Sequence, residues 1–508
     1  MLKNKYLTFI LIVPFLLLSC TDADIVSNFN NKGIENNKIV LTPEEFVSIA
    51  YDNPKELTEE EVSNVVSEFQ SKISAGKEVI TRNSETSKIS IRQKFYITKN
   101  NNFVETIAKT RSSMSKEVTI PIFEVELSSY NGEKSLAVVC GDERMPEVLF
   151  YTENYCPDSE IDNGTRYLLE LSKKNILSDI QQIEHIKSTQ RDSTLYKIAR
   201  QWNVPKEEVS YTAIKDQIVT TDEISTRNDN PGNPIGGVNR PDLYVVGYVN
   251  PMSKVVWSQS TPYKSAMPKM MIFDGNAGEY MGNIPVGCAN VAIGMVFSII
   301  KPTMSLDNNQ KVDWDYVTSV DHISGSSPQD LRNMISGLLA QIATATASTP
   351  YYEEKELINI DTESTYTKSV ITQTTTLTVN AVNYLRTMVN FSGDENYKFN
   401  GNQAKQSLFE RKPVFLCGYG HKVDDNGNII KDAGGHAWLI DGVVITRHPR
   451  RAGYYHYWSV NIGWGPGSKS YFRTSNDLQD CDVTFHTSSG NIAYYTQEMT
   501  MLYNISKK

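Results

Sequence analysis

Residues 220–240 contain the strongest interruption in the sequence. Asn, Asp, Pro and Gly fill nine of the ten positions from 228 to 237. Such a segment cannot build a regular helix or strand, and it predicts an exposed linker of the kind that proteases cleave. Because 508 residues are also too many for one ordinary core, the chain should form two folded units, residues 40–219 and residues 241–508.

The first 20 residues have the pattern of an export signal. Two lysines precede an apolar run at residues 6–18, which is shorter than the roughly 20 residues of a membrane-spanning helix. The run ends in Leu-Leu-Ser-Cys, which resembles a bacterial lipobox with Cys20 as the lipidated residue. A plain signal peptide with an incidental cysteine is the alternative. Residues 21–39 are polar and predict a flexible spacer.

These features predict an exported lipoprotein of the bacterial cell envelope, located on the outer membrane or the cell surface. Processing could later release the protein from this anchor. Its only membrane contact would be the lipid. The net charge of -9 argues against nucleic acid as a partner, since phosphates require a basic surface.

The cysteine count adds a second constraint. Five cysteines remain after Cys20, so at least one thiol stays unpaired in an oxidising compartment, which calls for a function. They are Cys140, Cys156, Cys288, Cys417 and Cys481. None has the close spacing of metal ligands, so we expect no metal site. Whether Cys140 and Cys156 pair is left open.

Residues 40–219 have the signals of an α+β unit. Thr42 and Thr58 are expected to cap helices, because each precedes acidic residues and an apolar periodic run. Residues 94–98 and 120–125 are rich in β-branched and aromatic types, which predicts strands. A long helix is expected over residues 165–185.

Cys288 is the first candidate for chemistry. It follows Gly287 and begins an apolar run that ends at Lys301-Pro302, which predicts a helix with the cysteine in its first turn. The free N–H groups and the dipole there favour a thiolate. A buried structural cysteine is the alternative.

His436 and Asn461 are the next candidates. His436 follows two glycines and is expected to start a short apolar strand that fixes its ring, although a core histidine is the alternative. Asn461 ends another strand, and its amide could orient the imidazole. Cys, His and Asn in this order suit a nucleophile, a base and an orienting group.

At these residues the chain resembles the streptopain family of papain-like cysteine peptidases. The family has a Gly-Cys at a helix start, a Gly-Gly-His-Ala strand and a Val-Asn-x-Gly-Trp-Gly strand, found here at residues 287–288, 434–437 and 460–465. A Trp-x-Gln-x-x-Pro-Tyr motif also matches residues 257–263. By this resemblance Gln259 would stabilise the oxyanion, and Gly435, Gly287 and Trp464 would border the substrate cleft.

The resemblance extends to residues 135–151, which look like the propeptide signature of the family. It implies an inhibitory α+β prodomain, a linker cut near Arg227, and an α+β papain-like catalytic domain. It also implies a secreted endopeptidase made as a zymogen, with a role in virulence, peptide or protein substrates, its own prodomain as inhibitor and no cofactor. Ile462, Pro466 and Asn290 depart from the family pattern and would reshape the walls of the site.

Two other functions remain open from the sequence. A transglutaminase-type acyl transferase could use the same triad. A surface lipoprotein could instead use an inactive peptidase scaffold for binding.

Overall fold

The computed structural model describes residues 38–75, 88–97, 103–104, 119–128, 133–153, 155, 163–222, 244–274, 278–358, 365–395, 397–423, 429–448, 450–451, 454–474, 484–486 and 492–508. The predicted signal peptide with Cys20 lies outside these residues. So do most of the predicted spacer and linker, including Arg227, and both Cys156 and Cys481.

The N-terminal part contains several helices, one of them long, a separate pair of parallel strands and strands of an antiparallel sheet. Its elements are β1 (Ile39–Leu41), α1 (Pro43–Ile49), α2 (Glu59–Ala75), β2 (Lys88–Ile97), β3 (Phe103–Val104), β4 (Ile120–Ser128), β5 (Lys134–Cys140), β6 (Val148–Thr152), α3 (Asn163–Trp202), η3 (Lys206–Glu208), α4 (Tyr211–Ile214), η4 (Lys215–Gln217) and β7 (Ile218–Thr220).

The C-terminal part begins with a strand and a group of helices and ends in long strands. Its elements are β8 (Tyr244–Val249), η5 (Tyr263–Ala266), β9 (Lys269–Asp274), β10 (Gly278–Asn283), α6 (Cys288–Ile300), α7 (Trp314–Val317), α8 (Gln329–Ala345), β11 (Thr349–Ile358), β12 (Thr365–Thr375), α9 (Thr378–Met388), β13 (Val389–Ser392), α10 (Gly401–Phe409), β14 (Val414–Val423), β15 (Ile429–Arg447), β16 (Tyr454–Asn461), β17 (Lys469–Thr474), β18 (Thr484–His486) and β19 (Ile492–Lys507).

The helix starts follow the local sequence signals. Thr42 and Glu45 form a reciprocal capping box at α1, and Thr58 and Glu61 exchange the same pair of hydrogen bonds at α2. The predicted strands are confirmed at residues 94–97 within β2 and at residues 120–125 within β4, and residue 98 lies outside the described residues. Helix α3 continues to Trp202, beyond the predicted end, because Pro205 is the first helix breaker after it.

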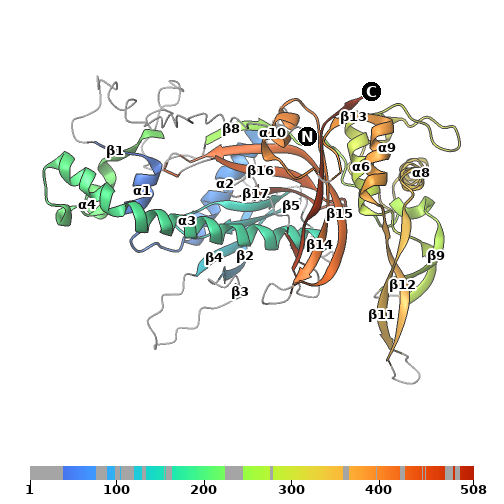
Figure 1. Cartoon of the computed structure of the whole chain (residues 1–508), viewed down its shortest axis with the longest axis horizontal. Helices are drawn as coiled ribbons and strands as arrows, with labels where there is room; N and C mark the ends of the chain where they lie inside the picture. Colours follow the sequence, from blue (N-terminus) through green and yellow to red (C-terminus); the bar gives the residue numbers. More distant parts are fainter. Residues whose placement is uncertain are drawn as a thin grey trace, which may run out of the picture.

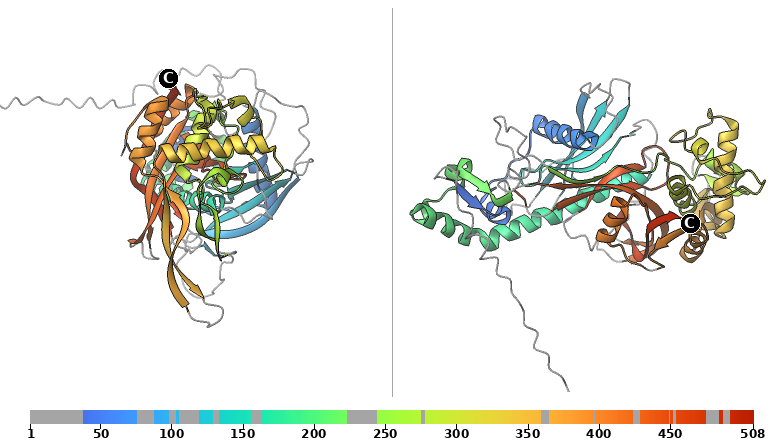
Figure 2. Two further views of the ribbon diagram at one scale, coloured as in Figure 1. Left: turned by 90° about the vertical axis from the view of Figure 1, so that its right-hand side faces the viewer. Right: turned by 90° about the horizontal axis from the view of Figure 1, so that it is seen from above.

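One large sheet joins the two parts of the chain. Its strand order is β13-β19-β14-β15-β16-β17-β6-β5-β4-β2-β3, and β6 of the N-terminal part pairs with β17 of the C-terminal part. In Figure 1 this sheet occupies the middle of the molecule, α3 runs along it, and α6, α8 and α9 gather at one end. Figure 2 shows the same arrangement from two further sides. The mixture of helices and sheet confirms the predicted α+β class.

The buried apolar residues form two clusters, and the large sheet, not the predicted linker at residues 220–240, lies between them. Trp438 and Ile440 of β15 face a cluster that includes α1, α2 and the sheet of the N-terminal part. Ala437 and Leu439, on the alternate face, pack in a second cluster with α6 and α8. Because side chains alternate along a strand, β15 contributes to both cores.

The prediction that His436 starts a strand is wrong. β15 begins at Ile429, and His436 lies within it, paired with Gly418 of β14. Gly434 and Gly435 pair with Gly420 and Tyr419, so glycines on both strands let the ladder continue through this point. The first residue of the predicted linker, Thr220, likewise belongs to β7 and pairs with Leu41.

No helix in the described part of the chain is long and apolar enough to span a membrane.

Candidate active site

Cys288 is the first residue of helix α6. Gly287 is the N-cap and has a φ of 91°, a left-handed conformation that favours glycine. A Cβ at this position would lie 3.0 Å from the carbonyl oxygen of Thr374. The turn therefore needs Gly287, and it places the Cys288 thiol among the free N–H groups at the start of a buried helix.

The Cys288 thiol reaches across to strand β15. Burial raises the pKa of this thiol, whereas the backbone N–H groups of Ala437, Ala289 and Cys288 itself favour the thiolate. Burial is the larger effect, so the thiol is neutral near pH 7 in this state. The contact with Ala437 places the sulfur beside the residue that follows His436.

His436 is buried, and its ring is held by a carbonyl and two indoles. Nε2 lies 3.1 Å from the carbonyl oxygen of Ile462. Because that oxygen only accepts, Nε2 carries a proton and the neutral ring keeps its lone pair on Nδ1. The ring centroid lies 4.7 Å from that of Trp464 and 6.1 Å from that of Trp438. Burial lowers the pKa of His436 to about 4, although the bond to Ile462 acts in the opposite direction.

One cavity of about 230 Å³ brings the predicted groups together. Cys288 and His436 both line it, as do three other residues that the sequence singled out: Gln259, Gly435 and Trp464. One wall comes from the end of β12 and from Tyr351, and the facing wall comes from β14 and β15. All the described residues of the lining lie between 259 and 464.

Gln259 is placed by the loop that leads to Cys288. Its backbone carbonyl accepts a hydrogen bond from the N–H of Val286, at 3.1 Å. This bond joins the Gln259 loop to the residue two positions before the nucleophile. The predicted oxyanion role of Gln259 stays a prediction, and its position at the cavity is compatible with it.

Asn461 has different partners from those expected. Its side chain is fully buried, donates to the carbonyl of Val255 at 3.0 Å and accepts from the N–H of Gly463 at 3.2 Å. Asn461 makes no hydrogen bond to His436 in this state, and it is not part of the cavity lining. Gly287 is buried beside the cavity and is not part of the lining either. The catalytic role of Asn461 and the substrate contact of Gly287 stay predictions.

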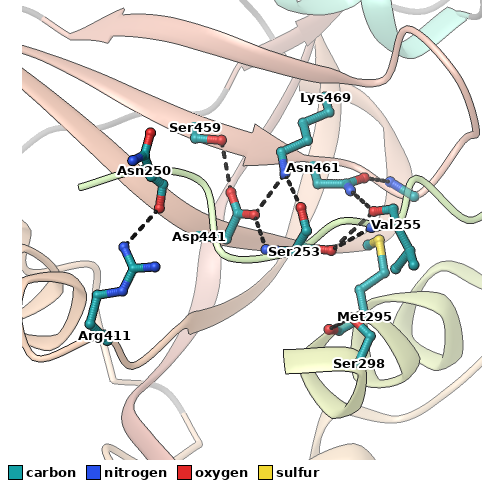
Figure 3. Close-up of polar contacts among 11 residues, drawn as sticks. Asn250, Ser253, Val255, Met295, Ser298, Arg411, Asp441, Ser459, Asn461 and Lys469 are labelled. Carbon is teal, nitrogen blue, oxygen red and sulfur yellow. Dashed lines mark hydrogen bonds and ion pairs between the residues drawn. The ribbon is translucent and has the colours of Figure 1, made fainter. Parts of the chain in front are cut away.

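The segment before Gln259 is fixed by a buried carboxylate. Asp441 accepts hydrogen bonds from the N–H of Ser253 at 2.8 Å and from Ser459 at 2.7 Å, and it pairs with Lys469 at 2.9 Å (Figure 3). The same figure shows Asn461 bonded to Val255, two residues along this segment. Asp441 belongs to the Ile-Asp-Gly of the histidine motif, so that motif also positions the segment that carries Gln259.

Sequence reasoning missed a second thiol at the site. Cys417 lines the same cavity, and burial raises its pKa to about 12. Its Sγ lies 3.8 Å from Oγ1 of Thr378. Cys417 pairs with Ala437 across β14 and β15. That pairing depends on strand register between distant residues, which no local pattern around Cys417 discloses. Cys140 is a buried free thiol far along the other half of the sheet.

Asn290, which differs from the family pattern, holds neighbouring segments together through its side-chain hydrogen bonds. Its amide donates to the carbonyl of Val286 at 2.7 Å and to Ser348 at 2.9 Å, and its oxygen accepts from Thr346 at 2.9 Å. These bonds fix the first turn of α6 to the segment that begins β11.

Residues 257–472 match the model of the Peptidase C10 family. The match covers less than half of the chain, and it includes Gln259, Cys288, His436 and Asn461. The resemblance drawn from the motifs is thereby confirmed, and the protein is a cysteine peptidase. Within the described residues there is no group of three or more His, Cys, Asp or Glu side chains that could hold a metal ion.

Two solved structures resemble this chain. A prointerpain A fragment from Prevotella intermedia is 16% identical, with 76% of this chain and 96% of the fragment covered and a TM-score of 0.38. Active interpain A from the same organism is also 16% identical, with coverages of 52% and 96% and a TM-score of 0.33. No curated protein matches the chain.

Proposed function

We propose that this protein is an exported, lipid-anchored cysteine endopeptidase made as a zymogen. The observation that carries the proposal is the shared cavity of Cys288 and His436, whose sulfur and ring come from a helix start and a facing strand. The Peptidase C10 match supports the same reaction class.

In the proposed reaction, the Cys288 thiol gives its proton to His436 Nδ1, and its sulfur attacks the carbonyl carbon of a peptide bond. Gln259 and the backbone N–H of Cys288 hold the oxyanion that forms. The imidazolium protonates the leaving amine as the C–N bond breaks, which leaves an acyl-enzyme. His436 then activates a water molecule, whose oxygen bonds to the acyl carbon and releases the thiol.

The zymogen proposal rests on the charge state of the site and the attachment of the N-terminal part. With the thiol pKa raised and the imidazole pKa near 4, the thiolate-imidazolium pair is not formed in this state at neutral pH. No described residue before Gln259 lines the cavity. We expect the sheet that joins the two parts to take part in inhibition.

Cys20 and the cleavage site near Arg227 complete the proposal. Export and lipidation predict a mature protein whose N-terminal mass includes a diacylglyceryl group on Cys20. Activation would then leave a catalytic fragment that begins within residues 220–240. Mass spectrometry of both N-termini checks these two points, and an unmodified Cys20 would remove the anchor from the proposal.

The test of the reaction is hydrolysis of an internally quenched peptide mixture by the full chain after linker cleavage. Wild type should release free carboxyl ends, while Cys288→Ala and His436→Ala should each lose at least about 1,000-fold in kcat/KM. Equal activity of wild type and Cys288→Ala would contradict the proposal. Amine incorporation without hydrolysis would instead indicate the transferase, and peptide binding without either reaction would indicate the binding scaffold.

A further inference from the structure

We infer that strand β11 is a docking strand on which an extended polypeptide substrate pairs before it enters the cavity. This inference rests on the proposed function, because it assigns the substrate conformation at the same site. The strand belongs to the hairpin β11–β12, which extends away from the helices of the C-terminal part (Figure 1).

Strand β11 is the edge of a four-stranded sheet with the order β10-β9-β12-β11. It has ten residues, and among the described strands it pairs only with β12. Its outer side therefore presents a row of backbone N–H and C=O groups. Extended peptides commonly bind such edges by adding a strand, with affinity from main-chain hydrogen bonds.

The edge leads directly to the nucleophile. Tyr351, the third residue of β11, lines the cavity with Cys288 and His436. Gln373 and Thr375, at the end of β12, line the same wall. A polypeptide that continues along β11 past Tyr351 therefore arrives in the space where the thiol attacks.

The base of the hairpin is fixed to the loop and helix that carry Cys288. Thr374 Oγ1 donates to the carbonyl of Pro285 at 2.5 Å. Ser348, just before β11, bonds to Thr376 at 2.6 Å and accepts from Asn290 of α6 at 2.9 Å. The start of β11 thus keeps a defined position relative to the nucleophile, which a docking strand requires.

The hairpin also has the side chains of a contact surface. Tyr351, Tyr352 and Tyr366 are 37%, 55% and 46% exposed. Tyrosine supplies large contact area with little loss of conformational entropy, and it is enriched in binding surfaces.

A substrate fits this edge better than a second copy of the chain. The sequence of β11 places glutamates at positions 353, 354 and 356. Although Lys355 lies among them, each β11 strand keeps an excess of negative charge, so antiparallel pairing of two β11 strands is unfavourable. Continuity with the catalytic cavity likewise favours an occupant that must enter that cavity.

The test compares long and short substrates on the full chain after linker cleavage. In the shortened variant, Asn-Gly replaces residues 354–369 and joins Glu353 to Val370, which are cross-strand partners, so a two-residue turn fits. A second variant, Tyr352→Ala, keeps the hairpin and its backbone N–H groups but removes the most exposed of its three exposed tyrosines. We measure kcat/KM for ten-residue and four-residue peptides that share one cleavage site.

The ratio of long-peptide to short-peptide kcat/KM should fall at least about tenfold in the shortened variant, because several main-chain hydrogen bonds are lost, and by a smaller factor in Tyr352→Ala, which loses one side-chain contact. The matched control is Tyr280→Ala, an exposed tyrosine on the opposite edge strand β10, which should keep the wild-type ratio. An unchanged ratio in the shortened variant would overturn the inference.

Binding by the full chain with Cys288→Ala separates this inference from the proposed function. If the hairpin docks substrate, its dissociation constant for the ten-residue peptide rises at least about tenfold when the hairpin is shortened, whether or not wild type hydrolyses anything. If wild type hydrolyses peptides and neither ratio nor binding changes, the function stands and the docking strand is wrong. A doubled solution mass that the shortened variant loses would show that a second copy is the occupant, which overturns the choice of substrate.

Discussion

Asn461 does not hold the imidazole by a hydrogen bond in this structure. The sequence pattern suggests that its amide holds His436, but the structure shows the Ile462 carbonyl at Nε2 and Asn461 between Val255 and Gly463. The side chain therefore connects the Gln259 segment to the turn that carries Trp464.

If this bridging role is the main one, Asn461→Ala should lower the free energy of unfolding by about 2 to 3 kcal/mol. Two hydrogen bonds are lost, and the buried N–H of Gly463 loses its acceptor, while the Val255 carbonyl keeps the bond from Ser253. Urea unfolding measures the change. A variant with wild-type stability but greatly reduced kcat would instead show that Asn461 acts on His436 directly.

His436 makes stability depend on pH. Its folded pKa of about 4 lies below the value of 6.5 expected when unfolded, so the unfolded chain binds the extra proton between these two values. Stability is therefore lost as the pH falls through this window, with about 2 to 3 kcal/mol from this residue by pH 4.5.

Comparison of wild type with His436→Gln isolates this contribution from those of His448 and His456, whose pKa values burial also lowers. The loss of unfolding free energy between pH 7 and pH 4.5 should be smaller in the variant by that amount. An equal loss in both proteins would show that the His436 ring is not desolvated.

At the scale of elements, the start of α6 and the Asp441 cluster fix the site. Asp441 is fully buried and bonds to Ser253, Ser459 and Lys469, which come from the segment before Gln259, from β16 and from β17. Removing one member of such a buried network leaves the others without their partner.

Asp441→Ala should therefore destabilise the protein by about 3 to 5 kcal/mol, mainly because the partly buried Lys469 ammonium loses its carboxylate partner. Asp441→Asn, which keeps acceptor capacity for Ser253, should lose less. Thermal unfolding of both variants checks the order, and equal stability of Asp441→Ala and wild type would contradict the assigned role.

The element starts could be predicted because their causes are local. Thr42, Thr58 and Gly287 each determine a helix start through groups within four residues. The start of β15 could not be predicted, since the glycines before His436 look like a break until their partners on β14 are known. Contacts between distant residues depend on strand pairing, so the sequence placed Cys288 and His436 in one site only because several motifs occurred together. It contained no pattern that indicated Cys417 or Tyr351 as residues of the site.

At the scale of the whole molecule, the N-terminal part is attached by a sheet and a buried ion network. Arg473 of β17 pairs with Glu147 and Asp179, each at 2.8 Å, and Arg451 also pairs with Glu147. All four side chains are nearly inaccessible. The two carboxylates belong to the N-terminal part and the two guanidinium groups to the C-terminal part, so this network joins the two parts.

Glu147→Gln should weaken this attachment, because both arginines lose a buried charged partner. We expect a loss of about 3 to 5 kcal/mol in unfolding free energy and faster release of the N-terminal fragment after linker cleavage. Size-exclusion chromatography of the cleaved chain follows the release. Glu44→Gln, on α1 outside the network, is the control and should behave as wild type. Continued association with unchanged stability in Glu147→Gln would rule out the network as the attachment.

The central claim is that Cys288 is the reactive thiol of a cysteine peptidase whose site is neutral before activation. The direct measurement is alkylation by a peptidyl epoxide at pH 7, mapped by mass spectrometry on the full chain before and after linker cleavage. Cys417 provides an internal control, because it lines the same cavity but has a pKa of about 12. The account predicts labelling of Cys288 alone, at least about tenfold faster after cleavage and absent in His436→Ala. Labelling of Cys417 at the same rate, or labelling of Cys288 that neither cleavage nor His436 affects, would contradict it.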